Sequence, residues 1–561
     1  MTSLGTMTRF YRNQAVLNEF FAIGGLERGG GLMAPPAYLL DETLDFPYKS
    51  RSDGKEILFA DHLTVVRFLG GINDERIANR EERESADLVE RDDNDCIHYR
   101  FDRLDWFSPF VDRYGPELTL VLDNIPWAFC AKANIDGYGQ SAPPADYEQW
   151  AAFITALCEE LVRRYGFETV NAWRFRLATE ARLETDTAGF IRHYKATVGA
   201  VRGVLPGARF SYYNTAGVHA AASQHINPYE AIETVVAAGL PVDFAPVSYY
   251  SVPRYPQDLP AKDRAASGRH DGCKVSPWSV SPVLRAEREY PEHWRLIDEA
   301  AGRRLPREIQ ELGVLVSECG VRTSEPGARG AAWLLQLLLT MRAESDIQRA
   351  WHWHTVDMVQ VPEKAAEQQS RLLRSNGWLY SILDHTIGGE LVLLDVQSDQ
   401  SDEPRFSRRA AAILGADNGR SYLLLSSFNI ERDEPRSEQV AVRIPVSELA
   451  DPVALRATWL TDETDVCRDV RDDLAERGQP EQAFLDKPNV LSTVCGINQP
   501  TDGMATPEGL AFVDRNFPAY AAIIQDSLRL KPFPGAVEQD GSDWILSMTM
   551  TTPSTVAVTW R

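Results

Sequence analysis

The stretch "NAWRFRLATEARLET", residues 171–185, decides the fold. It begins as a short strand in which Trp173, Phe175 and Leu177 alternate with other residues, and the strand stops at Glu180. The residues before it, 147–170, repeat their apolar positions with the period of an amphipathic helix. A helix that leads directly into a strand is the repeating unit of a parallel α/β sheet, so Glu180 lies at the C-terminal end of such a strand.

The same unit recurs along the first two thirds of the chain. Seven further apolar runs, most of them separated by helical patterns, end in polar or aromatic residues. Eight strands that alternate with helices predict a (β/α)8 barrel over residues 18–365. The seven runs are "FAIGGL" (21–26), "LTVVRFLGG" (63–71), "ELTLVLDNIPW" (117–127), "ARFSYYNTAG" (208–217), "VDFAPVSYY" (242–250), "GVLVSECG" (313–320) and "QRAWHWHTVD" (348–357).

The pattern changes after about residue 380. Short alternating runs separated by turns predict an all-β sandwich over residues 375–561, and residues 1–15 are a candidate for one additional strand. Two segments rich in Pro, Gly and Asp, 252–283 and 466–525, are predicted to be long loops.

Composition excludes several classes of function. Lys and Arg number 58 and Asp and Glu 81, a net charge of −23 that repels nucleic acids and anionic membranes. The seven cysteines lack the spacing of a disulfide framework or metal site, and no apolar segment is long enough to cross a membrane. Without a visible export signal, we expect a cytoplasmic protein that needs no cofactor or metal. A homo-oligomeric assembly is left open.

Two glutamates stand out among the strand ends. Glu180 ends the fourth run and Glu318 the seventh, and in a barrel these ends face each other across the mouth. Retaining glycoside hydrolysis needs two such carboxyl groups, a protonated acid for the leaving group and an ionised nucleophile for the anomeric carbon. A pair of glutamates at strand ends also suits a salt bridge or a metal site, so position alone does not establish catalysis.

Several motifs resemble glycoside hydrolase family 39, the family of β-xylosidases and α-L-iduronidases. They follow one another in the family's order from about residue 60, and "ATWLTDETDVCRDVRDDL" and "LSMTMTTPSTVAVTW" extend the resemblance to the C-terminus through its accessory β-sandwich. The motifs are "TVVRFLGGIND", "YRFDRLDWFSPFVDRYGPELTLVLDNIPW", "VNAWRFRLATEAR", "VDFAPVSYYSV", "VLVSECG" and "WHWHTVD".

The resemblance implies a role for individual residues. Glu180 matches the general acid/base and Glu318 the nucleophile, while Tyr250 and Arg67 match the residues that hydrogen-bond the nucleophile and keep it ionised. Trp353 matches the aromatic floor of the sugar site. The implied activity is exo-acting release of a terminal sugar by a retaining double displacement.

Three positions depart from the family pattern. Thr179 replaces the asparagine that normally contacts the sugar 2-hydroxyl, Ser248 replaces a histidine, and Arg176 stands where an acid is frequent. Trp127 and Asn214, which also lie at strand ends, complete the predicted substrate-binding residues. Thr179 offers one hydroxyl in place of an amide, so we expect a different contact to the sugar there.

Two alternatives remain open from sequence. Arg174 and Arg176 suit either the carboxylate of a uronic acid substrate or an acid inside the barrel. The loss of the asparagine before Glu180 also leaves room for a non-catalytic or differently catalytic barrel that binds carbohydrate. In either case the expected partner is an oligosaccharide or glycoside.

Overall fold

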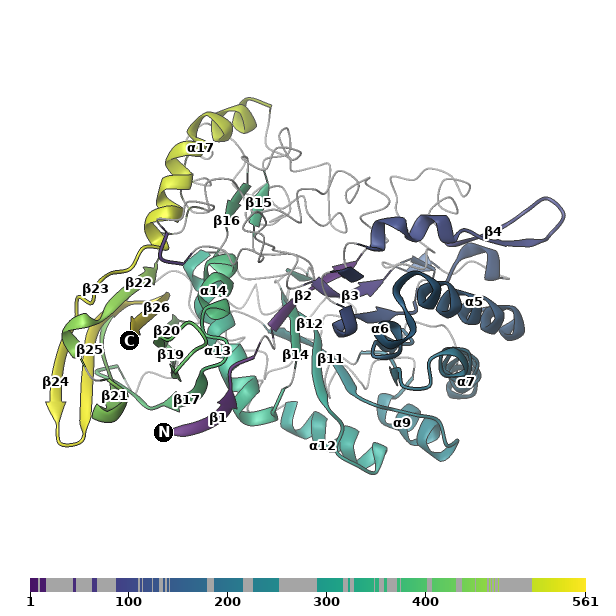
Figure 1. Ribbon diagram of the computed structural model, residues 1–561, viewed down its shortest axis with the longest axis horizontal. Helices are drawn as coiled ribbons and strands as arrows, with labels where there is room; N and C mark the ends of the chain where they lie inside the picture. Colours follow the sequence, from purple (N-terminus) through teal and green to yellow (C-terminus); the bar gives the residue numbers. More distant parts are fainter. Residues whose placement is uncertain are drawn as a thin grey trace, which may run out of the picture.

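The structure is a computed structural model of the whole chain. It describes residues 1–8, 11–16, 44–46, 63–67, 87–108, 111–112, 115–123, 125–130, 135–136, 139–140, 142–178, 186–214, 226–251, 290–315, 321–322, 327–347, 349–352, 358–360, 371–373, 375–400, 406–429, 436–449, 451–461 and 507–561, with four single positions between 464 and 473. Parallel strands lie at the centre of Figure 1, with the helices α5, α7, α9 and α12 on one side and antiparallel sheets on the other.

Eight strands form one continuous parallel sheet. Their order is β10-β9-β6-β3-β2-β14-β12-β11, which is the order of a chain that adds each new strand beside the last one around a ring. The short strand β13 (Val321–Arg322) pairs antiparallel with β12. The eight strands are β2 (Tyr11–Val16), β3 (Leu63–Arg67), β6 (Thr119–Val121), β9 (Arg174–Arg176), β10 (Arg209–Ser211), β11 (Ala245–Ser251), β12 (Arg307–Leu315) and β14 (Arg349–His352).

The sheet is rolled so that its two ends meet. The backbone N–H of Asp243, just before β11, donates to the carbonyl oxygen of Phe210 in β10 at 2.9 Å. The hydroxyl of Ser211 donates to the carbonyl oxygen of Phe244 at 2.5 Å. These bonds connect the two strands at opposite ends of the sheet order.

The first parallel strand differs from the sequence prediction. The run "FAIGGL" lies outside the described residues, and the strand β2 that pairs with β3 and β14 begins at Tyr11, ahead of the predicted boundary at residue 18. The segment Tyr11–Val16 reads "YRNQAV" and lacks an apolar run, so its own composition does not mark it as a strand. The segment forms a strand because its backbone hydrogen-bonds to β3 and β14 on either side, which composition alone does not reveal.

Helices cover the outer face of the rolled sheet. Leu120, Phe175 and Phe210 point outward into the main hydrophobic core, whereas their neighbours Thr119 and Arg176 are buried on the other face. The helices are α5 (Tyr147–Tyr165), α6 (Phe167–Asn171), α7 (Thr187–Val204), α9 (Pro228–Ala237), α12 (Tyr290–Ala301), α13 (Gly327–Ser345) and α14 (Ser375–Asp384).

Two antiparallel sheets pack face to face in the C-terminal part. A hydrophobic cluster that includes Leu423, Val442, Leu546 and Val556 fills the space between them. The seven-stranded sheet has the order β1 (Thr2–Thr6), β17 (Glu390–Leu394), β19 (Phe406–Leu414), β20 (Ser421–Asn429), β26 (Ser554–Trp560), β22 (Arg456–Leu460) and β23 (Lys531–Pro532). The four-stranded sheet has the order β18 (Val396–Ser398), β21 (Ser437–Pro445), β25 (Asp543–Thr551) and β24 (Ala536–Asp540).

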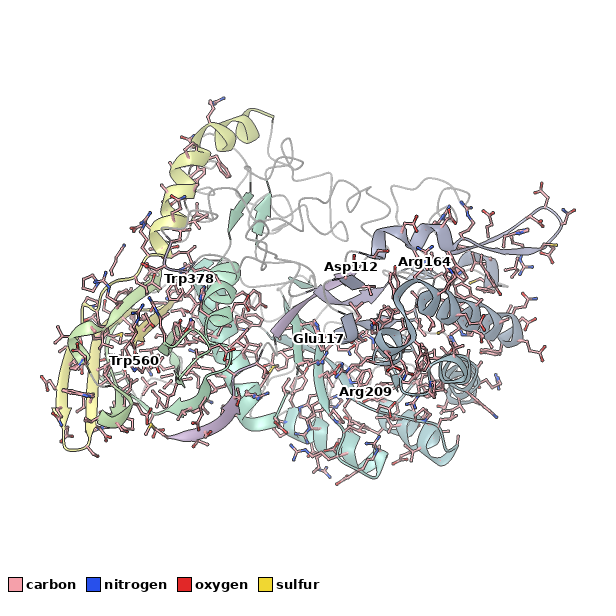
Figure 2. The ribbon with its side chains drawn as sticks, viewed as in Figure 1. Asp112, Glu117, Arg164, Arg209, Trp378 and Trp560 are labelled. Carbon is pink, nitrogen blue, oxygen red and sulfur yellow. The ribbon has the colours of Figure 1, made fainter. Side chains whose placement is uncertain are left out.

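The seven-stranded sheet also faces the first part of the chain. Leu424, Ile413 and Ala557 alternate along their strands with the residues of the sandwich core and join the main hydrophobic cluster beneath α13. Figure 2 labels Trp378 on α14, which belongs to the main hydrophobic cluster, and Trp560 on β26, which belongs to the cluster between the two antiparallel sheets. The Trp378 indole donates to the carbonyl oxygen of Ser527 at 2.8 Å.

One predicted loop is partly helical. Residues 507–527 form α17 (Pro507–Ser527), although the sequence analysis placed a loop as far as residue 525. Tyr520 and Ile524 are buried on one face of this helix and join the main core, so tertiary packing stabilises a helix that contains Pro518. Three two-stranded ribbons complete the described strands: β4 (Val89–Arg91) with β5 (Ile97–Tyr99), β7 (Ile135–Asp136) with β8 (Gly139–Gln140), and β15 (Met358–Gln360) with β16 (Arg371–Leu373).

Candidate functional site

The structure describes only part of the predicted site. Thr179, Glu180, Glu318 and Trp353 lie outside the described residues. Arg67 and Tyr250 end or nearly end the described strands β3 and β11, but their side chains are outside the description. Trp127, Arg176 and Asn214 are described in full, and each follows or ends a parallel strand.

Trp127 is held in place from two directions. It is 5% exposed and begins a short 3-10 turn in the loop that follows β6. Its backbone N–H donates to Oδ2 of the buried Asp87 at 2.6 Å. The Arg91 guanidinium, from the ribbon β4–β5, donates to the carbonyl oxygen of Ala128 at 2.8 Å. The loop that carries Trp127 is therefore tied to the segment that precedes and forms this ribbon.

Asn214 links two neighbouring strand ends. Its amide donates to the hydroxyl of Ser248 in β11, and both residues are fully buried. The Tyr290 hydroxyl, at the start of α12, donates to the carbonyl oxygen of Ser248 at 2.5 Å. Ser248 therefore anchors the end of β11 two residues before Tyr250, at the position where the family pattern has histidine.

A buried polar chain crosses the interior of the rolled sheet. Arg176 Nη1 donates to Gln310 Oε1 at 2.7 Å, and Gln310 Nε2 donates to Glu308 Oε2 at 2.8 Å. Glu308 Oε1 lies 3.0 Å from Nε of Arg174. Arg176 and Gln310 are 0% exposed and Glu308 is 1% exposed. We call these four residues the interior polar chain.

The interior polar chain shows that β9 and β12 face each other across the interior of the sheet. Five strand spacings separate β9 from β12 along the sheet order, which is about 24 Å in a flat sheet. A direct contact of 2.7 Å between their side chains requires that both strands face one enclosed interior. Arg176 is thus buried and paired with Gln310 inside the rolled sheet, and its contact with a substrate stays a prediction.

Positive charge accumulates in this interior. Arg349 in β14 is in register with Glu308, and its Nη1 donates to the carbonyl oxygen of Glu117 at 3.3 Å. Burial lowers the pKa of Arg349, and the nearby Arg174 guanidinium lowers it further. Glu308 is thus surrounded, among the described interior side chains, by the three guanidinium groups of Arg174, Arg176 and Arg349.

Sequence reasoning overlooked Asp87, Gln310 and Glu308. The segment "REIQELGVL", 307–315, does carry a signal, because Glu308 and Gln310 lie on either side of the buried Ile309 and are themselves buried, so the strand is covered on both faces. Polar residues in that pattern indicate a polar interior. Asp87 gives no comparable signal, since its partner Trp127 is 40 residues away in sequence.

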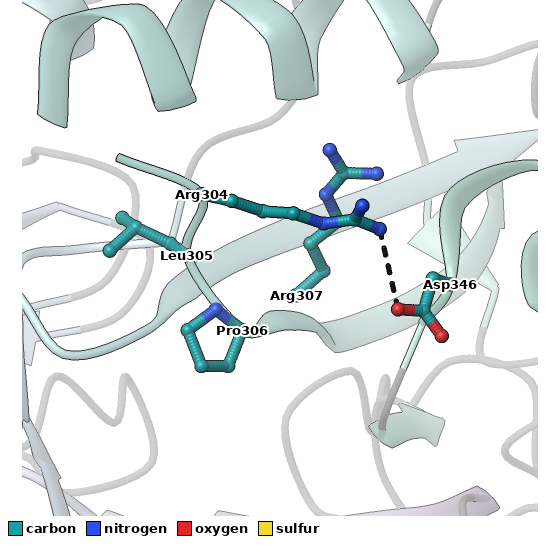
Figure 3. A pocket seen from close by; sticks show the side chains of 5 residues that line it. All are labelled: Arg304, Leu305, Pro306, Arg307 and Asp346. Atoms are coloured by element: carbon teal, nitrogen blue, oxygen red, sulfur yellow. Dashed lines mark hydrogen bonds and ion pairs between the residues drawn. The ribbon is translucent and has the colours of Figure 1, made fainter. Parts of the chain in front are cut away.

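A surface pocket lies at the opposite ends of the strands (Figure 3). It has a volume of about 220 Å³ and is lined by Arg304, Leu305, Pro306, Arg307 and Asp346, which precede or begin β12 and β14. Arg304 Nη2 lies 3.3 Å from Asp346 Oδ2, and Arg307 pairs with Asp298 at 3.0 Å. In barrels of this class the N-terminal strand ends serve stability, and this pocket is separate from the predicted mouth.

The described residues give no sign of a metal centre or membrane segment. None of their His, Cys, Asp and Glu side chains gather in threes suited to a metal ion, and Cys96, Cys130 and Cys158 are not disulfide-bonded. His352 and His354 are not described beyond the backbone of His352. Within the described parts, no helix has both the length and the apolar character needed to cross a membrane.

Comparison with known proteins agrees with this geometry. The model of glycosyl hydrolases family 39 matches residues 55–260, a range that begins before β3 and ends after β11. This region of the chain is similar to glycosyl hydrolases of family 39. The family 39 match includes the positions of Thr179, Glu180 and Tyr250.

Individual relatives cover smaller shares. The chain is 28% identical over 144 residues to an α-1,4-L-rhamnosidase of Formosa agariphila, across 23% of this chain and 29% of that protein. It is 26% identical over 121 residues to a β-xylosidase of Caldicellulosiruptor saccharolyticus, across 21% and 23%. These matches span less than a third of either relative.

A solved structure extends the likeness to the whole fold. A monomeric β-xylosidase from Caulobacter crescentus superposes with a TM-score of 0.58, and the match covers 100% of this chain and 97% of that one. The two sequences are 16% identical, so the likeness concerns the fold.

Proposed function

We propose that this protein is a retaining, exo-acting glycoside hydrolase that removes a terminal sugar from an oligosaccharide or glycoside. The observation that carries the proposal is the family 39 match over residues 55–260, which includes Glu180. The interior polar chain adds support, because it brings together the two strands that lead to Glu180 and Glu318.

The proposed fold is a closed (β/α)8 barrel followed by a β-sandwich. The circular strand order and the hydrogen bonds between Phe210, Ser211 and residues 243–244 support closure of the barrel. Its limits are proposed as residues 11–365, and those of the sandwich as 375–561 together with β1, which pairs with β17.

In the proposed mechanism, Glu318 attacks the anomeric carbon while Glu180 donates a proton to the departing oxygen. The glycosyl ester on Glu318 is then hydrolysed by water that Glu180 deprotonates, which restores the original anomer. Arg67 and Tyr250 keep Glu318 ionised by charge and hydrogen bonding. Trp127, Asn214 and Trp353 supply the surrounding contacts to the sugar.

Thr179 guides the choice of sugar. An amide at this position both donates to and accepts from an equatorial 2-hydroxyl, and a threonine hydroxyl cannot reproduce both bonds. A furanoside or a sugar with an axial 2-hydroxyl avoids this demand. L-Rhamnose has an axial 2-hydroxyl, and one relative of this chain is an α-1,4-L-rhamnosidase. We therefore rank α-L-rhamnosides ahead of β-D-xylosides as substrates.

The first test is a panel of 4-nitrophenyl glycosides that includes α-L-rhamnoside, β-D-xyloside and α-L-arabinofuranoside. Wild-type protein, Glu318→Ala and Glu180→Ala are compared with Glu168→Ala, an exposed glutamate on α6, as the matched control. We expect Glu318→Ala to lose activity, and Glu180→Ala to keep more of it on activated substrates and to recover with azide.

The anomer that forms first decides the mechanism. NMR of the reaction mixture should detect the retained anomer before mutarotation mixes the two forms. If the inverted anomer appears first, Glu318 is not the nucleophile. If the wild-type protein binds sugars without cleaving any member of the panel, the alternative of a non-catalytic carbohydrate-binding barrel replaces this proposal.

A further inference from the structure

The interior polar chain stands out because barrel interiors are usually filled with branched aliphatic side chains. Here a guanidinium, an amide and a carboxylate occupy that space, and all three are at least 99% buried. Burial of such groups costs free energy that hydrogen bonds only partly offset, so stability alone gives little reason to keep them. A role in fixing geometry accounts for them better.

The chain joins two strands that are far apart in the sheet order. Gln310 is the central member, since its amide accepts from Arg176 of β9 and donates to Glu308 of its own strand β12. Glu308 in turn pairs with Arg174, two residues before Arg176. Two contacts therefore join the strands, and a sliding motion of β9 against β12 would break the Arg176–Gln310 hydrogen bond and the Arg174–Glu308 ion pair.

The same two strands lead to the proposed glutamates. In the sequence Glu180 follows Arg176 by four residues, and Glu318 follows Gln310 by eight. Retaining hydrolysis requires the two carboxyl groups to be about 5–5.5 Å apart. An error of about 1 Å in the placement of such groups can reduce the rate on the order of a hundredfold.

We propose that Arg176 and Gln310 are positioning residues that fix the strand leading to Glu180 against the strand leading to Glu318. This inference rests on the proposed function and adds to it residues that do not touch the sugar. The Arg176 guanidinium also places positive charge beneath the mouth. Among the described charged side chains, Arg174 and Glu308 belong to the same polar chain, Arg349 is in register with Glu308, and Asp123 follows β6 in the same alternation phase.

The test compares Arg176→Met, Arg176→Lys and Gln310→Met with wild-type protein. The matched control is Arg408→Met, because Arg408 and Glu438 form a buried ion pair in the sandwich, where no proposed catalytic residue lies. All variants are assayed on the best aryl glycoside of the panel. Rates are expressed per active site, counted by the burst of nitrophenol.

Arg176→Met and Gln310→Met should each lower kcat per active site at least about tenfold, with KM within about twofold of wild type. Arg176→Met should also move the acidic limb of the kcat/KM profile to higher pH, because loss of a nearby cation raises carboxylate pKa values. Arg176→Lys should return that limb toward wild type. Arg408→Met should lower Tm and should change neither kcat per active site nor the acidic limb of the kcat/KM profile.

The inference is overturned if kcat per active site in Arg176→Met and Gln310→Met stays within about twofold of wild type, as in Arg408→Met. If Arg176→Met fails to fold, Gln310→Met alone decides, since it keeps the guanidinium and removes only its acceptor. If the wild-type protein is active and the variants are equally active, this inference is wrong and the proposed function is unaffected. A wild-type protein inactive on the whole panel overturns both.

Discussion

At the scale of single residues, specific hydrogen bonds fix the positions of polar groups at the ends of the parallel strands. Asn214 and Ser248 bond to each other at neighbouring strand ends, and Trp127 is tied to Asp87 through its backbone. Each contact joins residues at least 34 positions apart in sequence. These residues of the proposed site are therefore held by single hydrogen bonds between distant segments, and single substitutions should change the proposed specificity.

Thr179→Asn should shift the preference between sugars. The amide restores a paired donor and acceptor for an equatorial 2-hydroxyl, so the ratio of kcat/KM on β-D-xyloside to that on α-L-rhamnoside should rise at least about tenfold, roughly 1.4 kcal/mol. Steady-state kinetics on the two nitrophenyl glycosides measure this ratio. An unchanged ratio would show that residue 179 does not contact the sugar 2-hydroxyl. Thr179→Val, which lacks a side-chain hydroxyl, serves as the control.

His193 should make the protein sensitive to acid. It is fully buried between α5 and α7, its ring nitrogens bond to none of the described residues, and burial lowers its pKa to about 3. Between pH 6.5 and 3 the unfolded chain binds a proton at this residue and the folded chain does not. Stability should therefore fall as the pH drops through this range, by roughly 1.4 kcal/mol per pH unit for this group.

The substitution His193→Leu isolates that contribution. It replaces an unbonded polar ring by an apolar side chain of similar size, so the stability at pH 7.5 should change by less than about 1.5 kcal/mol. Thermal unfolding followed from pH 7.5 to 4.5 should show a shallower decline of Tm in the variant than in the wild type. Parallel curves for the two proteins would rule out His193 as a source of the acid sensitivity.

At the scale of elements, the helices that cover the parallel sheet have defined ends. The Asp146 carboxylate accepts from the backbone N–H groups of Glu148 and Gln149 at 2.8 and 3.1 Å and begins α5. Gly166, with φ of 85°, ends α5 in the left-handed region, where a residue with a Cβ is strained. These caps orient α5 so that Phe153 and Leu157 face the core.

Removal of the α5 cap should cost a moderate amount of stability. Asp146→Ala leaves two backbone donors unbonded and should lower the stability by about 1 kcal/mol, while Asp146→Asn, which keeps an acceptor oxygen, should lose only a few tenths. Differential scanning calorimetry of the two variants at neutral pH checks the order. Equal Tm values for both variants would mean that water replaces the cap at no net cost.

At the scale of the whole molecule, the two parts share one continuous core. Leu424 and Ile413 from the seven-stranded sheet belong to the same buried cluster as Leu338 on α13. The amide of Gln336, also on α13, donates to the carbonyl oxygen of Ser426 at 3.3 Å. The strand β1 adds a further connection, because it lies at the edge of the seven-stranded sheet while β2 follows it into the parallel sheet.

A chain truncated after residue 365 should therefore fail to fold. It keeps α13 but loses α14 and the sheet that covers α13, so several buried leucines become exposed to water at a cost of about 1.5–3 kcal/mol each. Expression of residues 1–365 should give insoluble protein, in contrast to the full chain. A soluble truncated chain with a cooperative melting transition would show that the first part folds on its own.

The sequence by itself determined the alternation of helices and strands and the change to β structure after residue 380. Seven of the eight predicted parallel runs overlap described strands, although β12 begins six residues before its predicted run, because apolar periodicity follows directly from burial of one face or both. Short-range pattern also located the family motifs. The predicted roles of Glu180 and Glu318 came from strand ends and resemblance, and they stay predictions.

Tertiary structure alone decided the remaining features. The polar strand β2 and the helix α17 depend on distant partners, and so does the contact of Arg176 with Gln310, 134 residues away. The register of β12 shifts against both neighbours between Ile309 and Leu312, so a strict alternation of faces cannot be counted through to the end of that strand. Local composition indicates which residues prefer burial. The pairing of buried polar groups depends instead on which strands come together, and this is determined only when the strands at the two ends of the sheet meet.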